Sequence, residues 1–237
     1  AEKYQKEFNL PVDIHYGPGS PNEDELSLLG NVDGKDILEL GCGGAQCAIA
    51  FAKKGALVTG VDFSKEQLRF ATELAKKNQV NVTFLQHDIC DLSPIPDCSK
   101  DIVFSAFALL YINDKKSVFS EAYRVLKPGG QFVFSLDHPM YRKIDPKTLI
   151  MHESYFQDEK LIDDWGDFGK TDFYPYTISD LINLLIQENF QIKHLIEPDS
   201  RKKYDYDPWF GHYDIYVPKL MDMVPPTIIY HAIKSEC

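Results

Sequence analysis

Short apolar runs alternate with amphipathic stretches along most of the chain. Apolar residues recur at helical spacing between the runs, as in 45–54, 64–77 and 113–126, which predicts helices that each bury one face. The runs themselves are short and bounded by turn residues, which is typical of buried strands. They occupy 37–40, 57–61, 81–86, 101–105, 131–136, 191–197 and 227–234. Regular alternation of this kind predicts an α/β fold with a mostly parallel sheet.

Local signals mark where several helices begin and end. Ser64 followed by Gln67, and Thr177 followed by Asp180, are capping boxes that open helices. The sequence Lys-Pro-Gly-Gly at 127–130 is a helix stop, so the next strand is expected to begin at Gln131.

The stretch from Ile37 to Asp62 combines a strand, a glycine turn, a helix and a second strand. Glycines at 41, 43 and 44 follow the first strand at once, so the backbone amides of the turn are open to a ligand. Asp62 closes the second strand at the edge of the sheet where ligands bind in such folds. An acid about 20 residues past the first glycine is placed for ribose hydroxyls. The pattern predicts a site for a nucleoside-bearing cofactor.

Two features separate this turn from the dinucleotide-binding fingerprint. Gln46 stands where that fingerprint has its third glycine, and Glu39 places a carboxylate where a pyrophosphate would be disfavoured. The motif Glu39-x-Gly41-x-Gly43 instead resembles motif I of the class I S-adenosylmethionine-dependent methyltransferases. The sequence R-V-L-K-P-G-G at 124–130, before a strand, resembles a second hallmark of that family. The alternative, an α/β turn whose glycines serve only packing, stays open.

The resemblance covers about residues 30–137 by motif and most of 170–234 by the order of strands. It implies a Rossmann-like, doubly wound sheet of seven strands in the order 3-2-1-4-5-7-6, with the last strand antiparallel and helices on both faces. It also implies a transferase that uses S-adenosyl-L-methionine as its cofactor and belongs to the small-molecule type of methyltransferase domain.

We expect a single methyltransferase domain over residues 1–237, with three elaborations. The N-terminal segment 1–33 contains several aromatic residues, which favours a lid over a simple tether because aromatic faces attract a sulfonium. Two insertions rich in aromatic residues, 140–176 and 198–226, follow the fifth and sixth strands. We expect them to form a cover over the acceptor site; a secondary core or a dimer interface is the alternative.

The resemblance also implies which residues hold the cofactor. Glu39, Gly41 and Gly43 would hold its methionine and ribose side, and Asp62 would accept hydrogen bonds from the ribose hydroxyls.

The adenine end of the cofactor falls past the third strand. Asp88 would accept from the exocyclic amine there, with Ile89 packed nearby, unless Asp88 only caps its own loop. The predicted cofactor site is completed by residues from the lid, the turn and the strand ends: Tyr16, Cys42, Phe63, Gln67, Phe104 and Ser105.

The acceptor side has no diagnostic motif, but two residues are candidates for catalysis. His138 follows the fifth strand at the ligand-binding edge and has a side chain suited to act as a general base near neutral pH. Tyr111 follows the fourth strand, where many family members carry a histidine, and would orient the acceptor. Each has a structural alternative, as a satisfied loop histidine and as a packed aromatic.

The expected reaction is an in-line displacement that methylates an oxygen or nitrogen of a small molecule, for which alignment supplies most of the rate gain. Two other functions stay open. One is a catalytically silent cofactor-binding subunit of a partner, and the other is a nicotinamide-dependent oxidoreductase.

Composition narrows the partners. The net charge of −11 argues against a nucleic-acid substrate, since phosphate contacts need a basic face. No apolar run reaches the roughly 18 residues expected of a membrane span, and residues 1–10 lack the apolar core of a signal peptide. The five cysteines show no CxxC pairing, which favours a reducing cytoplasm and no metal site. We expect a cytoplasmic monomer or homodimer.

Overall fold

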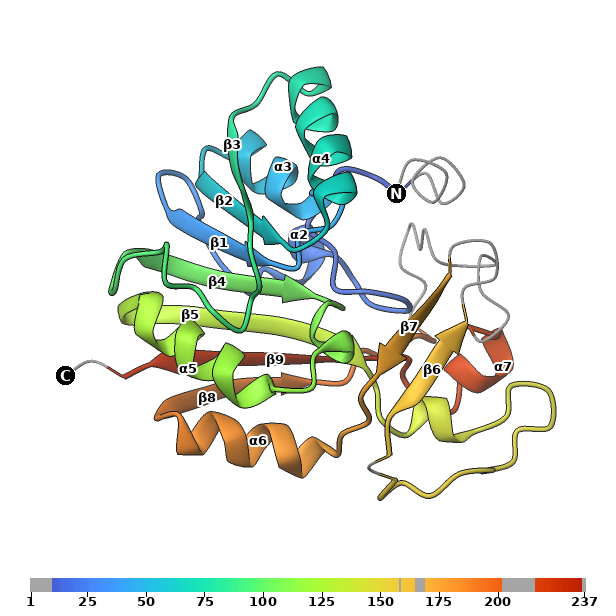
Figure 1. Cartoon of the computed structure of the whole chain (residues 1–237). Helices are drawn as coiled ribbons and strands as arrows, with labels where there is room; N and C mark the ends of the chain where they lie inside the picture. Colours follow the sequence, from blue (N-terminus) through green and yellow to red (C-terminus); the bar gives the residue numbers. More distant parts are fainter. Residues whose placement is uncertain (1–9, 158, 165–168, 202–215, 236–237) are drawn as a thin grey trace.

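The computed structural model describes residues 10–157, 159–164, 169–201 and 216–235 (Figure 1). A central sheet has the strand order β3-β2-β1-β4-β5-β9-β8, which is 3-2-1-4-5-7-6 when the strands of this sheet alone are counted. The first five strands are parallel, and β9 is antiparallel to both of its neighbours. The predicted fold class is confirmed. The strands are β1 (Asp36–Leu40), β2 (Leu57–Asp62), β3 (Val82–Gln86), β4 (Lys100–Ala106), β5 (Leu126–Asp137), β8 (Phe190–Ile196) and β9 (Thr227–Lys234).

Helices cover both faces of the sheet, as the apolar periodicity predicted (Figure 1). On one face, Phe51 and Ala71 belong to a core formed with the helices α3 and α4. On the other face, Phe119 and Leu181 belong to a second core formed with α5 and α6. The helices are α2 (Glu23–Leu26), α3 (Gln46–Lys53), α4 (Lys65–Lys77), α5 (Lys115–Val125), α6 (Ile178–Gln187) and α7 (Pro218–Met221). Ser64 and Thr177 cap α4 and α6.

The fifth strand begins earlier than predicted. Leu126 already pairs with Lys100 of β4, and the register then shifts so that Ile102 pairs with Gln131. The sequence at 127–130 is therefore an irregularity within the strand rather than a loop before it, and Gly129 adopts φ +74° there. Sequence periodicity could not show this because the segment contains a proline and two glycines.

A small hairpin was not predicted. Within the insertion after β5, β6 (Leu161–Asp164) pairs antiparallel with β7 (Lys170–Phe173), apart from the main sheet (Figure 1). Both strands have only four residues, and charged side chains interrupt their apolar pattern. Short 3-10 helices, η1 (Leu109–Tyr111) and η2 (Tyr141–Lys143), follow β4 and β5.

The N-terminal segment is joined firmly to the domain from Leu10 onward. Ile14 and Tyr16 are fully buried in the core. Gly17 has φ +118°, and a Cβ atom there would lie 2.0 Å from the ring of Phe107. Residues 14–17 of the predicted lid are thus packed against the core and against the loop after β4.

Several predicted features lie outside the described residues. They include the aromatic residues Tyr4 and Phe8 of the N-terminal segment, Trp165 and Phe168 of the first insertion, and all aromatic residues of the second insertion except Tyr216. In the part of the chain that the structure describes, no helix is both long enough and apolar enough to cross a membrane.

Candidate active site

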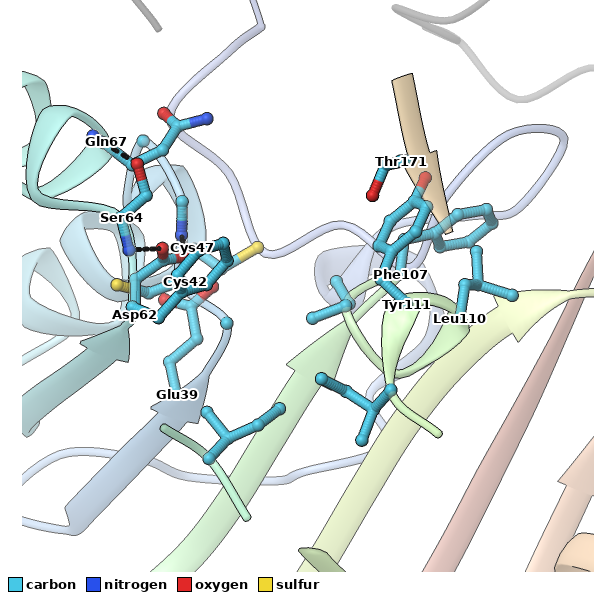
Figure 2. Close-up of a pocket in the computed structure, with 18 of the residues that line it drawn as sticks. Glu39, Cys42, Cys47, Asp62, Ser64, Gln67, Phe107, Leu110, Tyr111 and Thr171 are labelled. Atoms are coloured by element: carbon cyan, nitrogen blue, oxygen red, sulfur yellow. Dashed lines mark hydrogen bonds between the residues drawn. The ribbon is translucent and has the colours of Figure 1, made fainter. Parts of the chain in front are cut away.

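A pocket of about 900 Å³ opens at the C-terminal ends of β1, β2, β4 and β5. Figure 2 shows two groups of side chains that face each other across it. One group, here called the turn end, consists of Glu39, Cys42, Cys47, Asp62, Ser64 and Gln67. The other, here called the hairpin end, consists of Phe107, Leu110, Tyr111, Asp137, Arg142, Thr171 and Tyr216.

The glycine turn is held in shape by backbone geometry and by one carboxylate. Gly41 and Gly43 adopt φ +64° and +50°, a region that residues with a Cβ atom rarely enter. Asp62 accepts a hydrogen bond from the Gly43 N–H at 2.9 Å and another from the Ser64 N–H at 2.8 Å (Figure 2). Burial raises the pKa of the Asp62 carboxyl, and these two backbone bonds act against that rise.

Two buried acceptor atoms at the turn end lack a hydrogen-bond partner among the described residues. They are Oε2 of Glu39 and Oε1 of Gln67. Burial, together with repulsion from Asp62, raises the pKa of Glu39 to about 8. Buried polar atoms are nearly always paired in native structures, so both atoms fit a ligand that brings its own donors.

The loop after β3 borders the turn end. Asp88 and Ile89 line the pocket, and one Asp88 oxygen accepts from the Cys90 N–H at 2.9 Å. One of the two Asp88 oxygens therefore caps its own loop, as in the structural alternative for this residue. Phe63 also lines the pocket and is 79% exposed, so its aromatic ring is open to a ligand.

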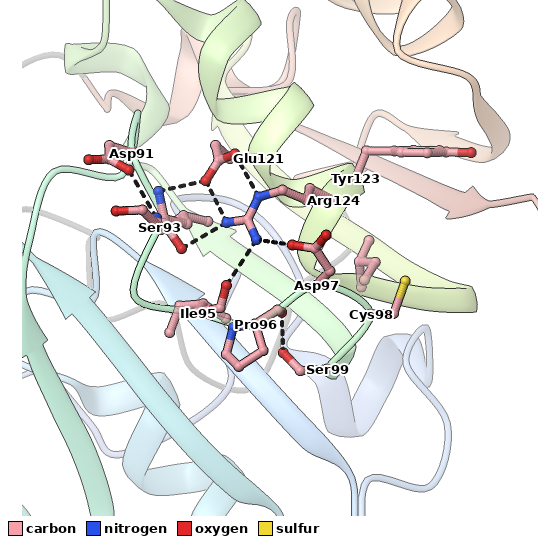
Figure 3. A network of polar contacts seen from close by, with 12 residues as sticks. Asp91, Ser93, Ile95, Pro96, Asp97, Cys98, Ser99, Glu121, Tyr123 and Arg124 are labelled. Atoms are coloured by element: carbon pink, nitrogen blue, oxygen red, sulfur yellow. Dashed lines mark hydrogen bonds and ion pairs between the residues drawn. The ribbon is translucent and has the colours of Figure 1, made fainter.

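Arg124, near the end of α5, anchors this loop through a network of hydrogen bonds (Figure 3). Its guanidinium makes two hydrogen bonds to Glu121, one to Asp97 and one each to the carbonyls of Leu92 and Ile95, at 2.5–2.9 Å. Five bonds match the five N–H donors of arginine. The arginine of the R-V-L-K-P-G-G sequence therefore holds residues 92–97, which follow Asp88 and Ile89 in the same loop.

Three predicted cofactor residues do not line the pocket. Tyr16 and Phe104 are fully buried and pack edge to face with their ring centroids 5.7 Å apart. Tyr16 also donates a hydrogen bond to Glu23 at 2.6 Å. Ser105 is fully buried and donates to the carbonyl of Leu40 at 3.1 Å. All three side chains belong to the packed core beneath the site.

His138 also lies outside the pocket lining. Its Nε2 is 2.8 Å from Oε1 of Glu197, and its Nδ1 accepts from the Met140 N–H at 3.2 Å. Both ring nitrogens are therefore engaged in contacts that hold the chain after β5. This arrangement matches the structural alternative for His138. Tyr111, in contrast, lines the hairpin end.

The neighbouring Asp137 lines the pocket, where the sequence had predicted the side chain of His138. It is 1% exposed, accepts from the Tyr216 hydroxyl at 2.7 Å and pairs with the Nε–H of Arg142. The guanidinium of Arg142 lies 4.4 Å from the ring centroid of Phe173. Sequence reasoning missed this cluster, and the only local signal for it was the polar sequence directly after the fifth strand.

The chain directly after β7 is hydrogen-bonded to the loop after β4. The Tyr174 N–H donates to the Leu110 carbonyl at 3.0 Å, and the Lys115 ammonium donates to the carbonyls of Ile112 and Tyr174. Burial lowers the pKa of Lys115 to about 8.

Among the described residues, no group of three His, Cys, Asp or Glu side chains could hold a metal ion.

Similarity to known proteins agrees with this geometry. The family described as "Methyltransferase domain" matches residues 38–134. An uncharacterised protein of Haemophilus influenzae is 30% identical over 252 aligned positions, which cover 99% of this chain and 94% of that protein. A crystal structure of an S-adenosylmethionine-dependent methyltransferase from Mesorhizobium loti superposes with a TM-score of 0.67 at 25% identity, over 88% of this chain and 94% of that chain.

A named curated relative matches over a shorter region. The ubiquinone biosynthesis O-methyltransferase of Alkalilimnicola ehrlichii is 36% identical over 107 residues, 45% of this chain and 43% of that protein. The chain thus spans about half the length of the curated methyltransferases that it matches.

Proposed function

Because this chain belongs to the methyltransferase domain family of S-adenosylmethionine-dependent enzymes, we propose that it methylates an oxygen or nitrogen atom of a small molecule. The observation that supports this acceptor class is a single pocket that contains both the turn end and the hairpin end. Its volume of about 900 Å³ lies in the range of small-molecule sites. The net charge of −11 also favours a small molecule over a nucleic acid.

S-adenosylmethionine, when bound, supplies a methyl group activated by a positively charged sulfur. The turn end suits its chemistry because Glu39, Asp62 and Gln67 offer acceptors for an ammonium group and for ribose hydroxyls. We propose that Asp88, with Ile89, binds the adenine. Phe63 would add an aromatic face on the same side.

The chain's own contribution to the reaction is alignment. Phe107, Leu110 and Tyr111 form a mostly apolar wall at the hairpin end that would hold the acceptor against the methyl group and keep water out. We assign Tyr111 an orienting role. We assign His138 a structural one, since both of its ring nitrogens are engaged and the residue at the end of β5 that lines the pocket is Asp137.

The elaborations of the domain contribute to the pocket lining. Leu10, His15 and Pro18 come from the N-terminal segment, and Gly169, Lys170 and Thr171 come from the hairpin. Their place in the lining supports the proposal that these segments cover the acceptor site.

Binding and transfer can be tested in sequence. The melting temperature of the purified protein is expected to rise with S-adenosylmethionine and with S-adenosylhomocysteine, and to stay unchanged with NAD. The protein is then incubated with methyl-labelled S-adenosylmethionine and, separately, a small-molecule extract, bulk RNA and bulk protein. Label in the small-molecule fraction supports the proposal. Label only in RNA or protein contradicts the acceptor class, and cofactor binding without any transfer favours the silent partner subunit.

A further inference from the structure

His231 in β9 is a buried histidine that makes no hydrogen bond with the part of the chain that the structure describes. It is 6% exposed, and both of its ring nitrogens lack a partner. A neutral imidazole has one N–H donor and one acceptor nitrogen, and buried polar atoms of this kind are nearly always paired in native structures. Leaving both unpaired costs free energy, so the position favours a ligand or an ion that contacts the ring.

A second histidine stands directly opposite on the neighbouring strand. His194 of β8 pairs in register with His231, and an irregularity between Ile192 and His194 creates this alignment. With regular pairing, Lys193 would stand opposite His231, and His194 would point to the other face of the sheet. Bulges re-aim side chains in this way and are over-represented beside functional sites. The irregularity therefore brings the two imidazoles together on one face.

The spacing of the two rings suits a shared metal ion. Imidazole nitrogens bind zinc at about 2.0–2.1 Å, so two imidazoles on one tetrahedral ion have ring centroids about 5.3 Å apart. The centroids of His194 and His231 are 5.5 Å apart. A direct hydrogen bond between two imidazoles would give a similar spacing, but neither nitrogen of His231 makes one.

The charge state and the position of the pair agree with this chemistry. Burial, with repulsion from His194 and Lys193, lowers the pKa of His231 to about 4. Its ring is therefore neutral at neutral pH, and the neutral imidazole is the form that binds metal ions. His194 is exposed on β8, the edge strand of the sheet, so solvent reaches the pair from that side (Figure 1).

We propose that His194 and His231 form a two-histidine site for a divalent transition-metal ion, which would join the edge strand β8 to β9. Imidazole suits Zn²⁺, Ni²⁺ and Cu²⁺, whereas Mg²⁺ and Ca²⁺ prefer oxygen ligands. The described residues offer no third His, Cys, Asp or Glu ligand there, so water completes the coordination. Neither histidine lines the pocket, and the inference is therefore independent of the proposed function.

Metal titrations of the full chain test this site. Zn²⁺, Ni²⁺ and Cu²⁺ are titrated calorimetrically into protein from which EDTA has removed bound metal. Two imidazoles provide about half of the ligands of a structural zinc site, so we expect about one Zn²⁺ per chain with a Kd on the order of 10 μM, and tighter binding of Cu²⁺. Absence of binding by all three ions would overturn the proposal.

Variants assign the bound ion to the pair. His194→Gln and His231→Gln should each weaken Ni²⁺ binding at least about tenfold, because only one imidazole remains. His152→Gln is the matched control, since His152 is an exposed histidine outside the main sheet, and it should bind Ni²⁺ as the wild type does. Unchanged affinity in His194→Gln or in His231→Gln would assign the ion to another site and overturn the proposal.

Two further measurements separate metal binding from folding, since His231 is buried. The midpoint of urea unfolding should rise with Zn²⁺ in the wild type and in His152→Gln, and should not change in His194→Gln, which replaces an exposed side chain. Electron paramagnetic resonance of the Cu²⁺ complex should show coupling to two nitrogens in the wild type and to one in His194→Gln. Coupling to a single nitrogen in the wild type would exclude the two-histidine site.

Discussion

The carboxylate of Asp62 accepts a hydrogen bond from the backbone N–H of Gly43 at 2.9 Å, which joins the end of β2 to the turn after β1. Its other oxygen accepts from the Ser64 N–H at 2.8 Å. Both oxygens therefore have fixed positions, and each still has a lone pair that can accept from a ligand. Asp62 supports the turn and also belongs to the proposed cofactor site.

Asp62→Ala should weaken binding of S-adenosylhomocysteine by about 100-fold, because it removes acceptors for the ribose and loosens the turn together. Titration calorimetry measures the affinity directly. Asp91→Ala is a suitable control, since Asp91 is a 59%-exposed acid outside the pocket lining. Wild-type affinity in Asp62→Ala would remove Asp62 from the site.

The two turn glycines should respond differently to alanine. A Cβ atom on Gly41 would lie 2.2 Å from the Cβ of Ala108, whereas one on Gly43 would meet nothing within 4 Å. Both positions have positive φ, so each alanine variant pays about 1–2 kcal/mol of backbone strain. Gly41→Ala should cost at least about 2 kcal/mol more, because Ala108 has to move.

Urea unfolding of the two glycine variants checks this difference. Ala108 lines the pocket, so Gly41→Ala should also weaken ligand binding more than Gly43→Ala does. Equal losses of stability would show that the approach of Ala108 does not determine the choice of glycine at position 41.

The turn end was predictable because its signals lie close together in the sequence. Glu39, Gly41, Gly43 and Asp62 fall within one strand-turn-helix-strand unit, whose geometry follows from the parallel sheet. Capping residues and apolar periodicity likewise indicated most of the helices and all seven strands of the main sheet. These signals depend only on residues that lie close together in the sequence.

Most of the hairpin end, apart from Tyr111, was not predictable for the opposite reason. Tyr216 contacts Asp137 across 79 positions, and Arg142 reaches the pocket from an insertion without regular periodicity. Tyr16 and Phe104 illustrate a second limit, since a large aromatic side chain can serve a core or a ligand site equally well. Only tertiary packing showed that both rings are in the core.

Arg124 should matter for stability and for cofactor binding at once. Arg124→Lys keeps one positive charge but cannot make five directed hydrogen bonds, so we expect a loss of about 2–3 kcal/mol. The loop that carries Asp88 would loosen, and affinity for S-adenosylhomocysteine should fall by about tenfold. Arg69→Lys, at an exposed arginine of α4, is the control and should change neither quantity. Normal affinity in a destabilised Arg124→Lys protein would show that the hydrogen bonds of Arg124 stabilise the fold without contributing to cofactor binding.

Glu39 should make the stability of the ligand-free protein fall as the pH rises. Burial, with repulsion from Asp62 as a further cause, raises its pKa from 4.5 to about 8. The folded protein therefore keeps a proton that the unfolded chain releases above about pH 4.5, so this contribution to stability is lost as the pH rises towards 8. Glu39→Gln has no such proton, and its stability relative to wild type should be higher at about pH 8.5 than at about pH 5, by about 4 kcal/mol.

Urea unfolding of both proteins at the two pH values measures that difference, and Glu66→Gln, an exposed residue of α4, should show none. The same Glu39→Gln variant should bind S-adenosylmethionine more weakly, because a neutral amide is a poorer partner for an ammonium group than a carboxylate. A variant that gains stability at high pH and loses cofactor affinity would show that this carboxyl is kept for binding at a cost in stability. A stability difference that does not change with pH would instead mean that the Glu39 carboxyl does not titrate in this range.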